Sequence, residues 1–160
     1  MKLHYSTLYA IWSIVELAAR QNEVVSASDL AAKYGMSQHH LAKVLRTLSN
    51  AGIVSSTRGP GGGCTFTGNA KRLTMHDIIS IFEPTEDLLP KEERQDAPPL
   101  AREVDRVLGE IDRIAAATLK SVTIMTLIQN GQRNGSVPPN PGTQSGEASD
   151  ILSPRWIIDK

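Results

Sequence analysis

Cysteine is almost absent from this chain, and that scarcity narrows the kinds of protein it can be. The 160 residues include one cysteine, Cys64, which excludes an intrachain disulfide and a zinc site made of several cysteines. Aromatic residues make up 4%, so the core must be aliphatic. No apolar run reaches the length of about 18 residues that a membrane-spanning helix needs, and MKLHYSTLYA at the N-terminus lacks the features of a secretory signal. We therefore expect one cytoplasmic domain without membrane contact.

Charge of either sign is not in excess, because 17 Lys and Arg balance 17 Asp and Glu. The balance hides an uneven distribution along the chain. Residues 1–72 carry eight Lys or Arg and three Asp or Glu, a net charge of +5, whereas residues 73–160 carry nine and fourteen, a net charge of −5. A basic half joined to an acidic half is typical of a module that faces a polyanion, although chance clustering also accounts for the charges alone.

Apolar residues recur at helical spacing in the first part of the chain and predict two helices there. The first spans residues 6–20, with Ser6 as its N-cap. Ser26 and Asp29 have the spacing of a capping box, in which the hydroxyl accepts from the N3 amide and the carboxylate accepts in return. This pair predicts a short second helix over about residues 27–34.

A third helix is expected from Ser37, its N-cap, to about Asn50. Gly35 separates it from the second helix in the left-handed conformation that ends many helices. Two short helices joined by a tight turn with glycine form a helix-turn-helix. The β-branched and serine-rich segments Ile53–Thr57 and Cys64–Thr67 then predict two strands joined by a glycine-rich turn. A hairpin directly after the third helix has the position of a wing.

The C-terminal half is expected to hold a short helix, a loop and a long helix. Thr74 and Asp77 form a second capping-box pattern, which begins a helix to about Phe82. The acidic, proline-bearing residues 83–99 predict a loop, and a long helix follows over Leu100–Leu119. Steps of four and three dominate among its apolar residues, as in a coiled coil, and predict a homodimer interface. These residues are Leu100, Val104, Val107, Ile111, Ile114 and Leu119.

The third helix has an apolar and a polar face, because successive helical residues are rotated by about 100°. The core face holds Leu41, Val44, Leu45 and Leu48. The opposite face holds His39, Lys43 and Arg46, and Gln38 and His40 flank the N-terminal end, from which recognition helices contact base edges. Gln pairs with adenine, and Lys or Arg pairs with guanine or phosphate. This face predicts DNA binding, although any solvated helix face has a similar composition.

The wing strengthens the prediction of DNA binding. Arg58 lies at the base of its glycine-rich tip, and an arginine on a slim hairpin fits a narrow minor groove, where the negative potential is enhanced. Gly59, Gly61 and Gly62 would let backbone amides approach phosphates closely. A nucleotide-binding phosphate loop is not favoured, because neither the Gly-Lys-Ser/Thr ending nor the Gly-x-Gly-x-x-Gly spacing is present.

Three segments within residues 1–83 resemble the Rrf-two (Rrf2) family of bacterial regulators: MKLHYSTLYAIWSIVELA, SASDLAAKYGMSQHHLAKVLRTLSNAGIVSSTRGPGGG and LTMHDIISIFE. SVTIMTLI at residues 121–128 is similar to the end of the family's dimerisation helix. The resemblance implies cytoplasmic homodimers that bind palindromic operators on double-stranded DNA and usually repress. The DNA contacts that it implies fall on Ser37, Gln38, His39, His40 and Arg58.

The chain departs from the family pattern in its cysteines. Many members hold an iron–sulfur cluster on three cysteines between the fourth helix and the long helix, but residues 83–99 contain none here. We therefore expect no cofactor and place the chain with the cluster-free members, which respond to small molecules, partner proteins or thiol oxidation. Cys64 stands where the family often has tyrosine. Redox activity of this thiol is one interpretation, and a small residue packed on a strand is the favoured one.

These observations predict a mainly α-helical protein with a small β-hairpin, a winged helix-turn-helix followed by a long C-terminal dimerisation helix. Its expected parts are a DNA-binding domain at 1–83, an acidic effector-region loop at 84–99, a dimerisation helix at 100–130 and a flexible tail at 131–160. No catalytic or metal-ligating constellation is present, so we do not expect an enzyme. The order of elements and the family resemblance predict a transcriptional regulator. Two alternatives are a thiol- or ligand-responsive sensor, which uses Cys64 or the acidic loop, and a protein-interaction module without operator binding.

Overall fold

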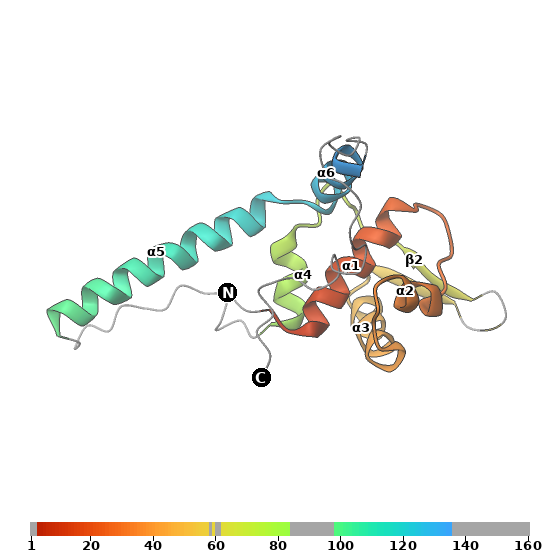
Figure 1. Cartoon of the computed structure of the whole chain (residues 1–160), viewed down its shortest axis with the longest axis horizontal. Coiled ribbons are helices and arrows are strands. Elements are labelled where there is room, and N and C mark those ends of the chain that lie inside the picture. Colours follow the sequence, from red (N-terminus) through yellow and green to blue (C-terminus); the bar gives the residue numbers. More distant parts are fainter. Residues whose placement is uncertain (1–2, 58, 60–61, 84–97, 136–160) are drawn as a thin grey trace, which may run out of the picture.

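The computed structural model describes residues 3–57, 59, 62–83 and 98–135. Within these ranges the chain forms six α-helices and one two-stranded hairpin (Figure 1), which confirms the predicted mainly α-helical fold. The elements are α1 (Tyr5–Ala19), α2 (Ala27–Lys33), α3 (Gln38–Asn50), β1 (Val54–Thr57), β2 (Gly63–Phe66), α4 (Met75–Phe82), α5 (Pro99–Ser121) and α6 (Ile124–Gly135).

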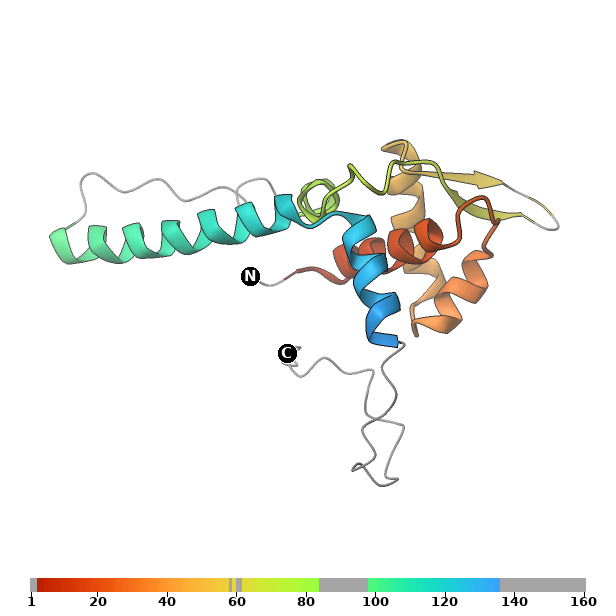
Figure 2. The same cartoon turned by 90° about the horizontal axis from the view of Figure 1, so that it is seen from above.

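Helix α1 lies at the centre of the globular part and packs against α3, α4, α6 and β2 (Figures 1 and 2). Its residues Ala10, Ile14 and Leu17 are fully buried, in one hydrophobic cluster with Leu41 and Leu48 of α3. Burial of one such leucine or isoleucine contributes about 1.5–3 kcal/mol. The buried members of this cluster are aliphatic residues with one methionine and one cysteine, as the low aromatic content predicts.

Two predicted helix starts are confirmed by their hydrogen bonds. Ser37 Oγ accepts from the backbone N–H of His40 at 3.4 Å, so α3 begins where its sequence predicts. At the start of α4, Thr74 Oγ1 accepts from the Asp77 N–H at 3.1 Å, and the Asp77 carboxylate accepts from the Thr74 N–H at 2.9 Å. This reciprocal capping box satisfies two amides that have no partner within the helix.

The capping box predicted at Ser26 and the N-cap predicted at Ser6 are wrong. Ser26 does cap α2, but its Oγ accepts from the Ser28 N–H at 3.2 Å, and the capping box with Asp29 does not form. Helix α1 begins earlier than predicted, with His4 as an N-cap that makes no side-chain capping bond. Ser6 therefore lies inside the helix, where its hydroxyl is available to a neighbouring element.

The hairpin follows α3 directly, as predicted for a wing, with Thr57 opposite Gly63 at its distal end. Val25, just before α2, extends the hairpin, because its backbone exchanges two hydrogen bonds with Cys64 at 2.8 and 2.9 Å. The approach is so close that a Cβ atom on Gly63 would lie 2.4 Å from the Val25 carbonyl oxygen. Glycine at this position therefore allows the hairpin to dock beside the helix-turn-helix.

Helix α5 extends away from the globular part, whereas α6 packs back against α1 (Figures 1 and 2). The chain leaves helical geometry at Val122, and the backbone N–H of Ile124 then donates to the Leu73 carbonyl at 3.0 Å. Ile124 is fully buried. Helix α6 continues to Gly135, so residues 131–135 of the expected flexible tail are helical.

The predicted acidic loop and C-terminal tail fall largely on residues 84–97 and 136–160, which lie outside the described residues. Glu83, the last described residue before that loop, is buried. Its carboxylate accepts hydrogen bonds from the Thr7 hydroxyl and from the His4 backbone N–H. Burial by itself would raise the pKa of Glu83, but these bonds and the His4 charge outweigh it and leave the pKa lowered.

Candidate nucleic-acid interface

Helix α3 has the two faces that its sequence predicts. Leu41, Val44, Leu45 and Leu48 are all buried, which confirms the core face. The predicted contact residues Ser37, Gln38, His39, Lys43 and Arg46 are all exposed. The apolar face of α3 is thus anchored on the core. Its other face is a polar surface about two and a half turns long that is open to a ligand.

The cations on α3 differ from those near α1 and α2 in having no counter-ion among the described residues. Lys43 and Arg46 form no ion pair with any residue that the structure describes. On α1 and α2, by contrast, Arg20 and Lys33 both bind the carboxylate of Glu16, at 2.6 and 2.7 Å. The positive charge that remains for an external anion in the helix-turn-helix is therefore concentrated on α3.

Glu16 joins the first two helices through a partly buried network, in which its own side chain is buried and its cationic partners are about half exposed. Besides the two cations, it accepts a hydrogen bond of 2.7 Å from the Tyr34 hydroxyl. Burial acts to raise the pKa of Glu16, but the hydrogen bonds from Lys33 and Tyr34 and the nearby positive charges leave it lowered. The same arrangement, with burial as its main cause, raises the pKa of Tyr34 to about 12. This network holds α2 on α1, and so fixes the position of the turn that precedes α3.

His40, one of the predicted DNA contacts, packs against the protein's own α1. Its Nε2 lies 3.1 Å from Ser6 Oγ, and its ring centroid lies 5.2 Å from that of Tyr9. His40 is half-buried as a result. The contact orients the first turn of α3 relative to α1. Sequence reasoning missed it because Ser6 and His40 are 34 positions apart and only the packing of α1 on α3 brings them together.

The wing contributes both exposed and buried residues. Gly59 is exposed at the tip, and its carbonyl accepts from the Gly62 N–H at 2.9 Å. The other two predicted wing contacts, Arg58 and Gly61, lie outside the described residues. Cys64 faces inward and is 4% exposed. Its burial in the core cluster is what the interpretation as a packed strand residue requires.

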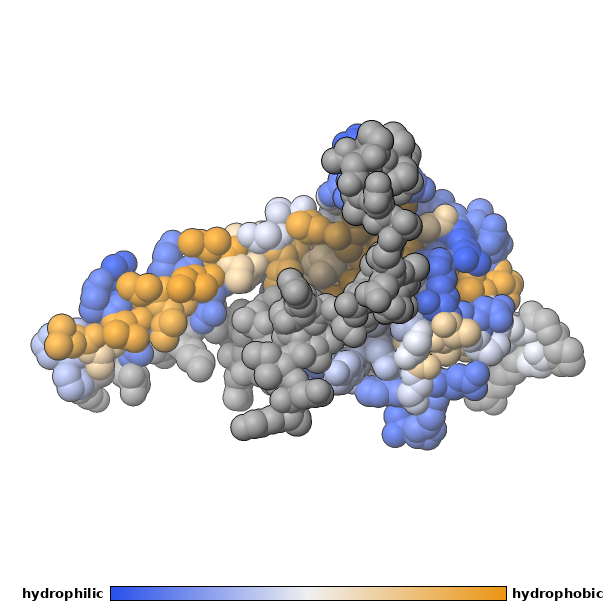
Figure 3. Space-filling model, viewed as in Figure 1, coloured by the Kyte–Doolittle hydropathy of each residue, from blue (hydrophilic) through white to orange (hydrophobic). Residues whose placement is uncertain are grey.

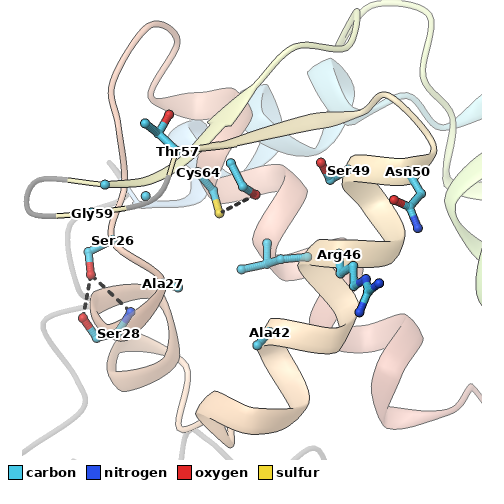
Figure 4. Close-up of a pocket in the computed structure, with 14 residues that line it drawn as sticks. Ser26, Ala27, Ser28, Ala42, Arg46, Ser49, Asn50, Thr57, Gly59 and Cys64 are labelled. Atoms are coloured by element: carbon cyan, nitrogen blue, oxygen red, sulfur yellow. Dashed lines mark hydrogen bonds between the residues drawn. The ribbon is translucent and has the colours of Figure 1, made fainter.

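Between α3 and the wing lies a cleft of about 850 Å³, lined mostly by polar residues and glycine, that the sequence did not reveal (Figure 4). Its walls come from the start of α2, the C-terminal half of α3 and the facing residues of the hairpin. Cys64 lies at its base, with its Sγ 3.6 Å from Ser56 Oγ. The described lining residues are Ser26, Ala27, Ser28, Ala42, Leu45, Arg46, Ser49, Asn50, Ser56, Thr57, Gly59, Gly62, Gly63 and Cys64.

The apolar stripe of α5 is exposed over most of its length and forms a continuous hydrophobic band (Figure 3). The exposed fractions are 84% for Leu100, 57% for Val104, 44% for Val107, 54% for Leu108, 57% for Ile111 and 58% for Ile114. Leu119, at the other end of the predicted stripe, is half-buried against the core of its own chain. Among the described helices, none is long and apolar enough to cross a membrane.

Together these features define a class of protein. Helices α2 and α3 are short and are joined by a turn that contains glycine. Helix α3 exposes one face and is followed by a hairpin. This arrangement is a winged helix-turn-helix. Lys43 and Arg46 lie on the helix that such proteins use for recognition.

The chain belongs to the Rrf2 family. The family model, described as an iron-dependent transcriptional regulator, matches residues 3–130. A relative from Rhodopseudomonas palustris, named the putative HTH-type transcriptional regulator BadM, is 46% identical over 129 residues, which cover 81% of this chain and 82% of the relative. The HTH-type transcriptional regulator CymR from Bacillus subtilis is 30% identical over 129 residues, covering 77% of this chain and 92% of CymR.

Solved structures show the same fold. The structure of CymR, the global cysteine regulator of Bacillus subtilis, aligns with a TM-score of 0.69 and 28% identity over 81% of this chain and 98% of CymR. The IscR structure from T. potens aligns with a TM-score of 0.65 over 86% of this chain and 93% of IscR, at 21% identity. The protein is thus a transcriptional regulator of the Rrf2 family and not an enzyme.

The family description names iron, but the donor set of this chain does not fit a cysteine-ligated cluster. Iron–sulfur clusters are held by several thiolates, and the chain has one cysteine. That residue, Cys64, is buried in β2. Within residues 3–57, 59, 62–83 and 98–135, no group of three or more His, Cys, Asp or Glu side chains is arranged to hold a metal ion.

Proposed function

We propose that this protein is a sequence-specific DNA-binding repressor that acts as a homodimer on a palindromic operator. Each protomer inserts the exposed face of α3 into a major groove. The hairpin then places Arg58 in the adjacent minor groove. Gln38 and His39 contact base edges, and Lys43 and Arg46 contact guanine or phosphate.

The observation that carries this proposal is the pair of cations on α3 that lack a counter-ion in the described part of the chain. Lys43 and Arg46 are exposed and lie among polar residues, whereas Arg20 and Lys33 are neutralised by Glu16. An exposed cation without a counter-ion gains most from an external anion, and the phosphates of DNA supply a dense array of them. The surrounding Gln and His side chains add donors and acceptors that distinguish base pairs.

The proposal of a homodimer rests on the stripe of α5. Six large apolar residues between Leu100 and Ile114 are 44% exposed or more, and they form one band on a helix that extends from the globular part. A contiguous exposed band of this kind is typical of an interface. Apart from Leu108, which flanks the stripe, its residues are spaced in steps of four and three, which suit packing against another helix of the same kind. Two-fold pairing of α5 helices would present two copies of α3 to a palindromic site.

Arg58→Ala and Lys43→Ala test the DNA-binding surface. We expect the wild-type protein to bind duplex DNA from the region upstream of its own gene with a steep dependence on salt, because phosphate contacts release counter-ions. Both variants should bind more weakly, and each should reduce the slope of log affinity against log salt by about 0.9 for every phosphate that it no longer binds.

Lys120→Ala is the matched control, since Lys120 is an exposed cation in the last turn of α5 and lies outside α3 and the hairpin. Its removal should leave both affinity and slope unchanged. Wild-type binding that is no tighter than binding to random DNA, with Lys43→Ala indistinguishable from Lys120→Ala, would contradict the proposed function. A reporter gene placed behind the bound site then tests repression, because a rise in expression on adding the protein would exclude it.

A further inference from the structure

We propose that the cleft between α3 and the wing is a binding site for the sugar-phosphate backbone of DNA. The cleft would bind the backbone of the DNA strand that runs between the major groove and the adjacent minor groove. The inference rests on the proposed function and extends it to residues outside the predicted site, chiefly Ser49 and Asn50 of α3 and Ser56 and Thr57 of β1.

The first argument is geometric. If α3 occupies a major groove and the hairpin enters the neighbouring minor groove, one DNA strand must pass between them. The cleft occupies that position, with Ser49 on the α3 wall and Thr57 on the hairpin wall (Figure 4). The cleft has a volume of about 850 Å³ and is open to solvent, so it is not a sealed cavity for a buried side chain.

The second argument is the chemistry of the walls. Among the lining residues that the structure describes, none is Asp or Glu, and Arg46 supplies a positive charge. Ser49, Asn50 and Thr57 have side chains with no hydrogen-bond partner in the described chain. Hydroxyl and amide side chains, together with arginine, are the usual donors to phosphate oxygens. Their donors remain available to an anion because no neighbouring element within the described residues uses them.

The third argument separates DNA from a small-molecule effector. Pockets for drug-sized ligands are lined mainly by hydrophobic and aromatic side chains, which exclude water from the ligand. This cleft has no aromatic residue among its described lining, and Ala27, Ala42 and Leu45 are its only aliphatic side chains there. Serine, threonine, asparagine and glycine supply most of the rest. A hydrated, charged backbone suits such walls better than an apolar ligand does.

Ser49→Lys and Thr57→Lys test the site by adding a cation to each wall in turn. If a phosphate passes through the cleft, each new ammonium group gains a phosphate contact. The slope of log affinity against log salt should then steepen by about 0.9, with tighter binding at low salt. The probe is a random-sequence duplex of about 30 base pairs, roughly three helical turns, because phosphate contacts do not depend on sequence. Ser49→Asp should weaken binding to the same duplex.

Ser80→Lys and Ser80→Asp are the matched controls, because Ser80 is an exposed serine on α4 and does not line the cleft. Both should leave the slope at the wild-type value. Thermal melts of every variant confirm that it folds. Because the lysine variants predict a gain of binding, a folding defect cannot imitate the expected result.

The outcomes distinguish this inference from the proposed function. If Lys43→Ala weakens DNA binding while Ser49→Lys and Thr57→Lys behave like Ser80→Lys, the function stands and the cleft is not a backbone site. If neither Lys43→Ala nor the cleft variants change binding, the proposed function fails as well. Slopes that steepen for the cleft lysines and not for Ser80→Lys support the backbone site.

Discussion

Gly63→Ala is expected to destabilise the protein through a backbone clash and not through reduced flexibility. The added Cβ atom would lie 2.4 Å from the carbonyl oxygen of Val25 and 2.8 Å from its carbonyl carbon. Both atoms belong to the backbone, so no side-chain rotation can relieve the contact. The hairpin must therefore move away from the segment before α2.

The expected loss in the free energy of unfolding follows from the contacts that this movement disturbs. Overpacking of a tight site costs about 1–3 kcal/mol. Moving the hairpin also strains two hydrogen bonds between Val25 and Cys64, each of which contributes about 0.5–1.5 kcal/mol. Because the strained bonds are part of the same displacement, we expect a decrease of about 2–3 kcal/mol in the free energy of unfolding, and not the full total of the two effects.

Gly131→Ala is the matched control. Gly131 lies within α6, and a Cβ atom there would meet nothing within 4 Å. Alanine is favoured over glycine in a helix by about 0.5–1 kcal/mol, so this variant should be slightly more stable. Urea unfolding at equal protein concentration, followed by circular dichroism, measures both changes. If Gly63→Ala unfolds at the same urea concentration as the wild type, the close approach of hairpin and Val25 does not constrain the fold.

Two further predictions concern assembly and pH. Ile111→Asp should convert the proposed dimer to monomers, because a carboxylate would be buried without a partner at the interface. Arg102→Asp, on the opposite face of α5, should leave the dimer intact. Analytical ultracentrifugation measures both, and a dimeric Ile111→Asp variant would refute the α5 interface. The pKa of Glu16 is lowered from 4.5 in the folded protein, so its contribution to stability is present above about pH 4.5 and disappears as the pH falls through the folded value. Glu16→Gln should therefore show a smaller drop in melting temperature between about pH 5 and pH 3 than the wild type, with part of the drop retained through Glu83; an equal drop in both proteins would rule this out.

Local features of the chain set where most elements begin and which faces they bury. Thr74 and Asp77 form their capping box within one helical turn, and the four leucine and valine residues of α3 follow the helical period. Neither signal depends on the rest of the chain. The same is true of the hairpin, whose strands and glycine-rich turn are contiguous in sequence. For that reason the order of residues alone was sufficient to predict the winged helix-turn-helix.

Contacts between distant segments depend on the tertiary structure. His40 shares the exposed end of α3 with Gln38 and His39, yet the packing of α1 turns its ring toward Ser6 and Tyr9. Leu119 was predicted to end the interface stripe of α5, yet the turn at Val122 brings that end of the helix onto the core. Helical periodicity describes the direction of a side chain relative to its own helix, and it does not describe which neighbour lies there.

The cleft and Gly63 show the same limit. The glycines of the wing are recognisable in sequence as a flexible turn, but the need for glycine at position 63 arises from the Val25 carbonyl 38 positions earlier. The cleft likewise joins residues of α2, α3 and the hairpin, none of which forms a motif by itself. A recognition helix and a wing thus follow from patterns within short stretches of the chain. The cleft between them exists because three separate elements pack together, and its walls are distant from one another in sequence.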